Sequence, residues 1–333
     1  MRIAFMLANI PFASPNGVTS QALTWKKGLE QRGHQISLIN PWEKNDWKAF
    51  DAIILFGFSE QACGFINIVW KVNRHIIVAP ILDPSYSISA LKIYTRWGSR
   101  KLRLTNPFYS MRSVKEKIGL FLVRSEFEQA YMSQGFDIPI DRCAIVRLSH
   151  EITAPQSFPE REPFCLHISL LCDERKNVRR LIEAAKKHKF KLVLAGMLRN
   201  DKEKGKLLSW IGDSSNIEYV GFVSEEKKMD LYARAKVFAL PSTNEGVGIV
   251  ALEAAAMGCN VVMTKLGGPK EYYSDMAEII NPYDIDEIGT AVMRFMNGEI
   301  SYQPRLAEYV EREYSARAIA QKLESVIHCV VEQ

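Results

Sequence analysis

The feature that most constrains the fold of this chain is the alternation of short apolar runs with stretches of helical spacing. Most runs are continuously apolar, which is typical of parallel strands covered by helices on both faces. In the first half they span residues 3–8, 35–39, 52–56, 76–81, 120–123 and 144–148. In the second half they span residues 165–171, 191–195, 217–220, 237–240, 261–264 and 278–280. This pattern predicts an α/β fold with doubly wound parallel sheets.

The length and composition of the chain predict two domains. A chain of 333 residues exceeds the usual size of one domain, and 47% hydrophobic with 24% charged residues is ordinary for globular proteins. Disordered and fibrous classes are therefore excluded. Residues 153–163 are rich in Pro, Gln, Ser and Glu, which predicts a linker. We expect one domain over residues 1–152 and a second over residues 164–313.

Cysteine usage and hydropathy indicate the compartment. The six cysteines are scattered and form no C-x-x-C pair, so we expect reduced thiols, a cytoplasmic protein and no zinc site. No apolar run approaches the ~20 residues of a membrane-spanning helix. Residues 3–8 resemble the apolar part of a signal peptide, but the turn-rich loop and helical spacing that follow favour a first buried strand.

The charge of the chain is unevenly distributed. The net charge is +5, with a basic excess in the first half and a slight acidic excess in the second. The basic residues concentrate in residues 92–117, where aromatic side chains are interleaved and where Arg112, Lys115 and Lys117 lie. Either this segment is a solvated surface, or it docks on acidic membrane headgroups or a lipid-linked pyrophosphate. The positive charge would also suit nucleic acid, but no other feature of the sequence supports it, so we expect no nucleic-acid partner.

Residues 238–271 carry the most informative pattern. A buried strand is followed by a loop with Gly246 and Gly248, and a helix then begins at about residue 249. A helix N-terminus at the carboxyl end of a strand presents free N–H groups that can bind phosphate, and glycines allow a close approach. The carboxylates of Glu245 and Glu253 would suit sugar hydroxyls instead. The alternative is that Glu245 caps the helix and Glu253 faces solvent.

The same stretch resembles the retaining nucleotide-sugar glycosyltransferases of the GT-B fold, notably glycosyltransferase family 4. The family pattern PS…EG-[FV]-G…LEA-x-A-x-G-x-PVV…GG-x-x-E is matched by Pro241, Ser242, Glu245, Gly246, Val247, Gly248, Leu252, Glu253, Ala254, Gly258, Val261, Val262, Gly267, Gly268 and Glu271. Asn260 stands where the family usually has Pro. The resemblance implies two Rossmann-like domains facing a cleft, with a last helix over about residues 314–333 that packs back on the first domain.

The resemblance also implies a role for each matching residue. Glu253 would hold the ribose hydroxyls of the nucleotide, and Glu245 would contact the hydroxyls of the donor sugar. Lys176 would pair with the diphosphate charge that grows as the glycosidic bond breaks. Donor contacts are also implied for Gly246, Val247, Gly248 and Ile249, for Val223 near the base, and for Gly17 near the diphosphate. The alternative for Gly17 is a helix-capping turn.

Two residues keep two interpretations each. The family usually has a phosphate-binding Arg five or six positions before the Lys, where this chain has Leu170 or Leu171. Arg175 either replaces that Arg or points to solvent. Asp83 ends an apolar run, where the family commonly has a His or Asp beside the reacting centre. Asp83 either positions the acceptor and handles a proton, or caps the following turn.

Ser125 and the D-x-D spacing at residues 284–286 have simpler explanations. Ser125 is expected to cap a helix that has Glu128 at its third position. Asp284 follows an Asn-Pro pair and is expected to cap a helix rather than to bind a metal.

The resemblance implies a metal-independent retaining hexosyltransferase without a further cofactor. It would move a sugar from a nucleotide-diphosphate donor to a hydroxyl of a glycan or lipid-linked acceptor, in bacterial surface polysaccharide or glycolipid synthesis. The protein would be cytoplasmic, with peripheral contact at the inner face of the membrane left open. The alternatives are a catalytically inactive GT-B-like binding protein, an epimerase, and an oxidoreductase, which the lack of G-x-G-x-x-G after the first strand disfavours.

Overall fold

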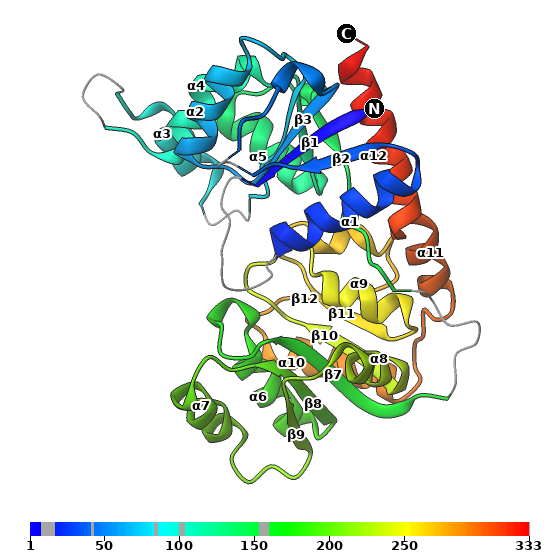
Figure 1. The fold of residues 1–333 in the computed structure, drawn as a ribbon. Helices are drawn as coiled ribbons and strands as arrows, with labels where there is room; N and C mark the ends of the chain where they lie inside the picture. The colour runs from blue at the N-terminus through cyan, green and yellow to red at the C-terminus, as the bar shows by residue number, and fades with distance from the viewer. Residues whose placement is uncertain (8–16, 41–42, 83–85, 100–103, 153–159, 333) are drawn as a thin grey trace. The chain divides into compact units, whose positions relative to one another are not determined.

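The computed structural model describes residues 1–7, 17–40, 43–82, 86–99, 104–152 and 160–332, which form two compact units (Figure 1). The first unit is Met1–Ser149 together with Ala316–Gln333, and the second is His150–Ser315. Each contains a six-stranded sheet in which every described pairing is parallel. The prediction of an α/β fold with doubly wound parallel sheets is confirmed.

The first unit has the strand order β2-β1-β3-β4-β5-β6. Its strands are β1 (Arg2–Leu7), β2 (Gln35–Leu38), β3 (Ala52–Phe56), β4 (Ile76–Ala79), β5 (Leu120–Val123) and β6 (Cys143–Ile145). Its helices are α1 (Gly17–Gln31), α2 (Glu60–Val69), α3 (Ile88–Arg96), α4 (Pro107–Val114), α5 (Glu126–Phe136) and α12 (Ala316–Val331). Each strand falls on an apolar run found in the sequence, because burial on both faces requires apolar residues at successive positions.

Alternate residues of the central strands pack against different helices. Ile53 and Leu55 of β3 belong to a buried cluster with Ile66 of α2. Phe56 instead contacts Trp25 of α1, with ring centroids 5.6 Å apart. On this second face α12 lies beside α1 (Figure 1).

The second unit has the strand order β12-β11-β10-β7-β8-β9. Its strands are β7 (Glu162–Leu170), β8 (Lys191–Met197), β9 (Ile217–Gly221), β10 (Ala235–Leu240), β11 (Asn260–Thr264) and β12 (Glu278–Ile280). Its helices are α6 (Val178–His188), α7 (Asp201–Ile211), α8 (Glu225–Arg234), α9 (Ile249–Ala256), α10 (Ile285–Met296) and α11 (Arg305–Tyr314). This alternation of strand and helix places helices on both faces of the sheet.

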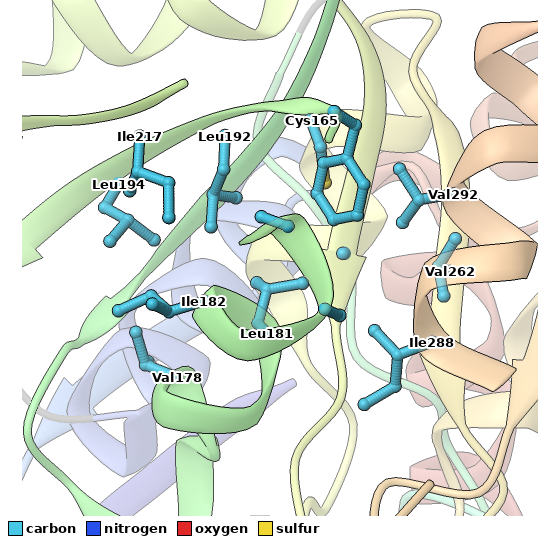
Figure 2. Packing of buried hydrophobic residues seen from close by; sticks show 14 of the residues in the cluster. Cys165, Val178, Leu181, Ile182, Leu192, Leu194, Ile217, Val262, Ile288 and Val292 are labelled. Carbon is cyan, nitrogen blue, oxygen red and sulfur yellow. The ribbon is translucent and has the colours of Figure 1, made fainter. Parts of the chain in front are cut away.

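One face of this sheet is closed by α6 and α10. Figure 2 shows Leu181 of α6 and Val292 of α10 pointing toward Cys165 and Val262 of the sheet, and all four are fully buried. On the opposite face the ring of Phe238 in β10 meets Tyr232 of α8, with centroids 5.9 Å apart. The core therefore fixes β7 and β10 at the centre of the unit.

The chain passes between the units at two places that are adjacent in space. The His150 N–H donates to the Tyr314 carbonyl at 3.1 Å, and His150 and Ser315 form an isolated parallel bridge. After the first passage, β7 begins at Glu162, which lies inside the segment 153–163 that the sequence predicts as a linker. Glu162 is held there by the guanidinium of Arg234, with Nε and Oε1 2.6 Å apart.

Across the described ranges, no helix combines the length and the apolar character needed to cross a membrane.

The contact between α1 and α12 depends on a glycine, which yields a stability prediction. A Cβ at Gly28 would lie 2.7 Å from the Ala320 Cβ, so Gly28→Leu should separate the two helices. We expect it to lower the free energy of unfolding by about 1–3 kcal/mol, measured by urea denaturation. Gly64→Leu on α2 is the matched control, because nothing lies within 4 Å of a Cβ there. Equal stability of the two variants would contradict the prediction.

Candidate functional site

Two loops of the second unit meet because β7 and β10 are parallel neighbours. Their carboxyl ends lie at the same edge of the sheet, so the segments that follow Leu170 and Leu240 leave side by side. The Thr243 N–H donates to the Arg175 carbonyl at 2.8 Å and joins the two loops. The edge formed by the carboxyl ends is where open parallel sheets bind ligands.

Lys176 and Glu245 form an ion pair across these loops. Lys176 ends a short 3₁₀ helix, Glu174–Lys176, and its Nζ lies 2.6 Å from Glu245 Oε2. The hydroxyl of Ser242 donates to the same carboxylate oxygen at 3.1 Å. The side chains of Lys176 and Glu245 are 21% and 13% exposed, so the pair is shielded from water but still reachable by a ligand.

Asn177 holds the site together, and sequence reasoning gave it no role. Its backbone is in the left-handed region (φ 57°), which Asn tolerates better than most residues. Its buried Nδ2 donates to the carbonyls of Pro241 (2.9 Å) and Pro282 (2.6 Å). Three loops at the sheet edge are thereby joined. The only feature of the sequence that could have pointed to Asn177 is its position next to Lys176, which matches the family.

The N-terminus of α9 lies next to this ion pair and is closely packed against its surroundings. Gly248 precedes the helix with φ 75°, and a Cβ there would lie 2.8 Å from Leu240 Cδ2. A Cβ at Gly267 would lie 2.4 Å from the Glu245 carbonyl oxygen. Within the described residues no side chain caps α9, so its first N–H groups and the positive end of its dipole remain available to an anion.

Glu253 belongs to a separate network on the same helix. Its Oε2 lies 3.2 Å from Lys228 Nζ and accepts a hydrogen bond from the Tyr232 hydroxyl at 3.1 Å. Burial lowers the pKa of Lys228, but the carboxylates of Glu253 and Glu225 more than offset this, so the net shift is upward. Burial, and then the Glu253 carboxylate, raise the pKa of Tyr232 well above its usual value. Sequence reasoning missed both partners, which come from α8.

The neighbours of Lys176 are arranged as follows. Arg175 pairs with Asp173, with Nη2 and Oδ2 3.0 Å apart, and its side chain is 54% exposed. Of the two positions at which the family's usual Arg could fall, Leu171 is fully buried in the core and Leu170 is partly exposed. Val223 lies between β9 and α8 and is partly exposed.

A buried histidine supports the end of β7. His167 Nδ1 lies 2.8 Å from the Ala239 carbonyl, and Nε2 lies 2.7 Å from Ser169 Oγ. Burial lowers the pKa of His167 to about 4; the carbonyl opposes this and the Lys176 ammonium adds to it. His167 is therefore neutral near pH 7, with Nδ1–H donating to the carbonyl, and it joins β7 to β10 below the loops.

In the first unit, the basic side chains singled out in the sequence have intramolecular partners. Arg112 Nη2 lies 2.8 Å from Asp137 Oδ2, and Lys115 Nζ donates to the Asp137 carbonyl at 2.5 Å. The Arg112 hydrogen bond is the main cause of the lowered pKa of Asp137. Lys117 Nζ donates to Asn67 Oδ1 at 2.6 Å. Arg112 and Lys115 thus complement the carboxyl end of α5.

The remaining predicted residues lie as follows. Gly17 begins α1 and is exposed, while Asp83 lies outside the described residues. Asp284 caps α10 by accepting the N–H groups of Asp286 and Glu287. Among the described residues, no group of three or more His, Cys, Asp or Glu side chains is placed to hold a metal ion.

Comparisons with known proteins show which proteins this chain is similar to. The family model described as glycosyl transferases group 1 matches residues 149–313, which include the whole loop cluster. The O-antigen chain mannosyltransferase B of Escherichia coli is 26% identical over 219 residues, covering 57% of this chain and 56% of the relative. The chain therefore spans little more than half the length of this curated relative.

Solved structures show the same fold. HepE of Anabaena, solved in complex with UDP, has a TM-score of 0.74 at 14% identity and covers 99% of this chain and 100% of its own. The lipopolysaccharide outer core galactosyltransferase WaaB has a TM-score of 0.73 at 16% identity and covers 99% of each chain. The chain has the GT-B fold, and its residues 149–313 match the glycosyl transferases group 1 family.

Proposed function

We propose that this protein is a hexosyltransferase that uses a nucleotide-diphosphate sugar and retains the configuration of the anomeric carbon. The observation that carries the proposal is the Lys176–Glu245 ion pair beside the uncapped end of α9, inside the segment that matches the family. A cation and a helix N-terminus suit a diphosphate, whereas a carboxylate suits sugar hydroxyls.

The proposed reaction needs a site that binds both the diphosphate and the donor sugar. The bond between the anomeric carbon and the diphosphate oxygen breaks, and the acceptor oxygen bonds to the same face of that carbon. The acceptor proton passes to the leaving phosphate, so no protein nucleophile is needed. Lys176 and the first N–H groups of α9, including Ile249, stabilise the charge that develops on the diphosphate. Glu245 gives up part of its hydrogen bonding with Lys176 and binds the hydroxyls of the donor sugar. The remaining rate acceleration comes from holding donor and acceptor in the reactive orientation.

The nucleotide is assigned to the other end of the site. Glu253 would accept hydrogen bonds from the ribose hydroxyls while Lys228 and Tyr232 keep its carboxylate fixed. Val223 would lie near the base. The backbone of Gly246, Val247 and Gly248 would contact the sugar and the diphosphate, and Gly17 and Arg175 are further candidates for diphosphate contacts. No metal or other cofactor is part of the proposal, because Lys176 supplies the positive charge.

The acceptor proposed is a hydroxyl of a glycan or lipid-linked glycan in bacterial surface polysaccharide synthesis. The names of the O-antigen mannosyltransferase and of the lipopolysaccharide galactosyltransferase support this class. The UDP in the HepE structure supports a nucleotide donor. Such synthesis takes place in the cytoplasm at the inner face of the membrane, where we place this protein. Asp83 stays a candidate for positioning the acceptor.

Neutralising either member of the ion pair should slow transfer strongly. Once a panel of UDP-, GDP- and dTDP-sugars has identified the donor, Lys176→Gln and Glu245→Gln should each lower kcat by about 10²–10³-fold in a radiolabelled transfer assay. Lys187→Gln is the control, because Lys187 pairs with Asp286 on the surface at 2.7 Å. Wild-type binding of a nucleotide sugar without any transfer would instead favour the inactive binding protein.

Glu253→Gln should weaken nucleotide binding rather than chemistry. Loss of hydrogen bonds to a charged group costs about 1.5–3 kcal/mol, so the Kd for the nucleoside diphosphate should rise about tenfold or more. Isothermal titration calorimetry measures this change, and Glu226→Gln, at an exposed position of α8, is the control. An unchanged Kd would remove Glu253 from the nucleotide site.

Contact with an anionic membrane is proposed for residues 92–117, with a refined set of residues. Arg112, Lys115 and Lys117 are engaged within the unit, whereas Ile93 and Trp97 are 66% and 76% exposed. Exposed apolar and aromatic side chains amid basic residues favour an interfacial position.

Ile93→Ser/Trp97→Ser should therefore lower binding to vesicles of phosphatidylglycerol and phosphatidylethanolamine at least several-fold in a flotation assay. Ile68→Ser, at a 69% exposed position on α2, is the matched control. Equal flotation of both variants and the wild type would contradict membrane contact by this segment.

A further inference from the structure

The chain leaves β4 in an unfavourable backbone conformation. Ile81 has φ 52°, in the left-handed region. A β-branched residue there is a genuine outlier, with a cost of roughly 1–3 kcal/mol. The other non-glycine residues with positive φ in the described chain are polar (Asp137, Asn177, Lys189, Ser274 and Asp275). Such strain persists only where surrounding contacts impose it, and it concentrates at functional sites.

The residue that follows Ile81 is held by one ion pair. The N–H of Leu82, the next residue, donates to Glu128 Oε1 at 2.7 Å. The carbonyl of the same residue accepts a hydrogen bond from Arg124 Nη2 at 2.9 Å. Both backbone polar groups of Leu82 are thus fixed by side chains that follow the neighbouring strand β5.

The pair itself is buried and fully formed. Arg124 Nε and Nη2 lie 2.9 Å and 3.1 Å from the two oxygens of Glu128, and the Arg124 N–H donates to Oε2 at 2.7 Å. Arg124 is 7% exposed and Glu128 2%. Ser125 caps α5 by accepting the Glu128 N–H at 3.0 Å, as predicted. The Glu128 carboxylate accepts hydrogen bonds from both Arg124 and Leu82.

Stability alone does not account for this arrangement. Desolvating a carboxylate and a guanidinium costs about as much as their attraction returns, and apolar residues of similar volume are often equally stable. Because this pair forms hydrogen bonds with the backbone at one strained strand end, we infer that it holds that backbone in position. The strand end lies at the carboxyl edge of a parallel sheet, where ligands of such sheets bind.

We propose that Arg124 and Glu128 are positioning residues that hold the backbone after β4 for the acceptor substrate. The inference rests on the proposed function. The ion pair and the nucleotide carboxylate assigned to the donor lie in the second unit, so the substrate served by this edge of the first unit is the acceptor. Neither residue is assigned a contact with the reacting atoms.

The decisive variant is Arg124→Met/Glu128→Met. Removing both charges avoids leaving one of them buried and unpaired, so the protein should still fold, which a cooperative thermal melt checks. Hydrogen–deuterium exchange should show faster exchange of the Leu82 amide. With the donor found in the panel and octyl α-D-mannopyranoside as acceptor, kcat/KM for the acceptor should fall about tenfold to a hundredfold. KM for the donor should change less than about twofold, because neither residue is assigned a contact with the donor.

The control is Lys26→Met/Glu30→Met, an ion pair of the same spacing on the exposed side of α1. It should change neither the exchange of Leu82 nor acceptor kinetics. Unchanged exchange at Leu82, or unchanged acceptor kcat/KM despite faster exchange, in the Arg124→Met/Glu128→Met protein would overturn the proposal. A wild-type protein that transfers no sugar from any donor would instead overturn the proposed function and the acceptor role with it.

Discussion

The parallel pairing of β7 with β10 is the constraint on which the candidate site depends. Because both strands run in the same direction, the loops that follow them must leave at one edge of the sheet. Lys176 and Glu245 come from those two loops and are 69 positions apart in sequence. The apolar core beneath them, which includes Val237 and Ala239, keeps the strands in register. The ion pair is thus a consequence of strand direction.

Each of the two candidate carboxylates, Glu245 and Glu253, has its own cation, and the two ion pairs differ in their surroundings. Lys228 is enclosed by Glu225 and Glu253, and its raised pKa shows that the charged form is stabilised in place. Lys176 shares Glu245 with the Ser242 hydroxyl at the open edge of the sheet. One network therefore keeps a carboxylate still, while the other holds the cation that the proposed mechanism assigns to the diphosphate.

The sequence predicts most of the fold because buried parallel strands have a local signature. Continuous apolar runs place all the described strands within a few residues of their bounds, and Ser125 and Asp284 cap helices as their spacing suggests. The strand β7 starts earlier than expected, at Glu162. A charged residue looks like linker until a distant Arg234 pairs with it.

The candidate site was only partly accessible from the sequence. Glu245 and Glu253 could be singled out through the family pattern, because both lie in one continuous segment made of a loop and the helix that follows it. Their partners could not, because Lys228 and Asn177 act through contacts that only the tertiary fold creates. The same holds for the basic segment of the first unit. Asp137, which binds Arg112, lies 25 positions away along the chain.

The two adjacent passages between the units have a topological consequence. The second unit is a continuous segment whose ends, His150 and Ser315, are bridged to each other, whereas the first unit is assembled from two separated segments. The second unit is therefore connected like an insertion in a surface loop of the first, an arrangement that proteins tolerate well. Recombination between relatives could exchange it as a cassette at these two points and leave the pairing of α1 with α12 untouched.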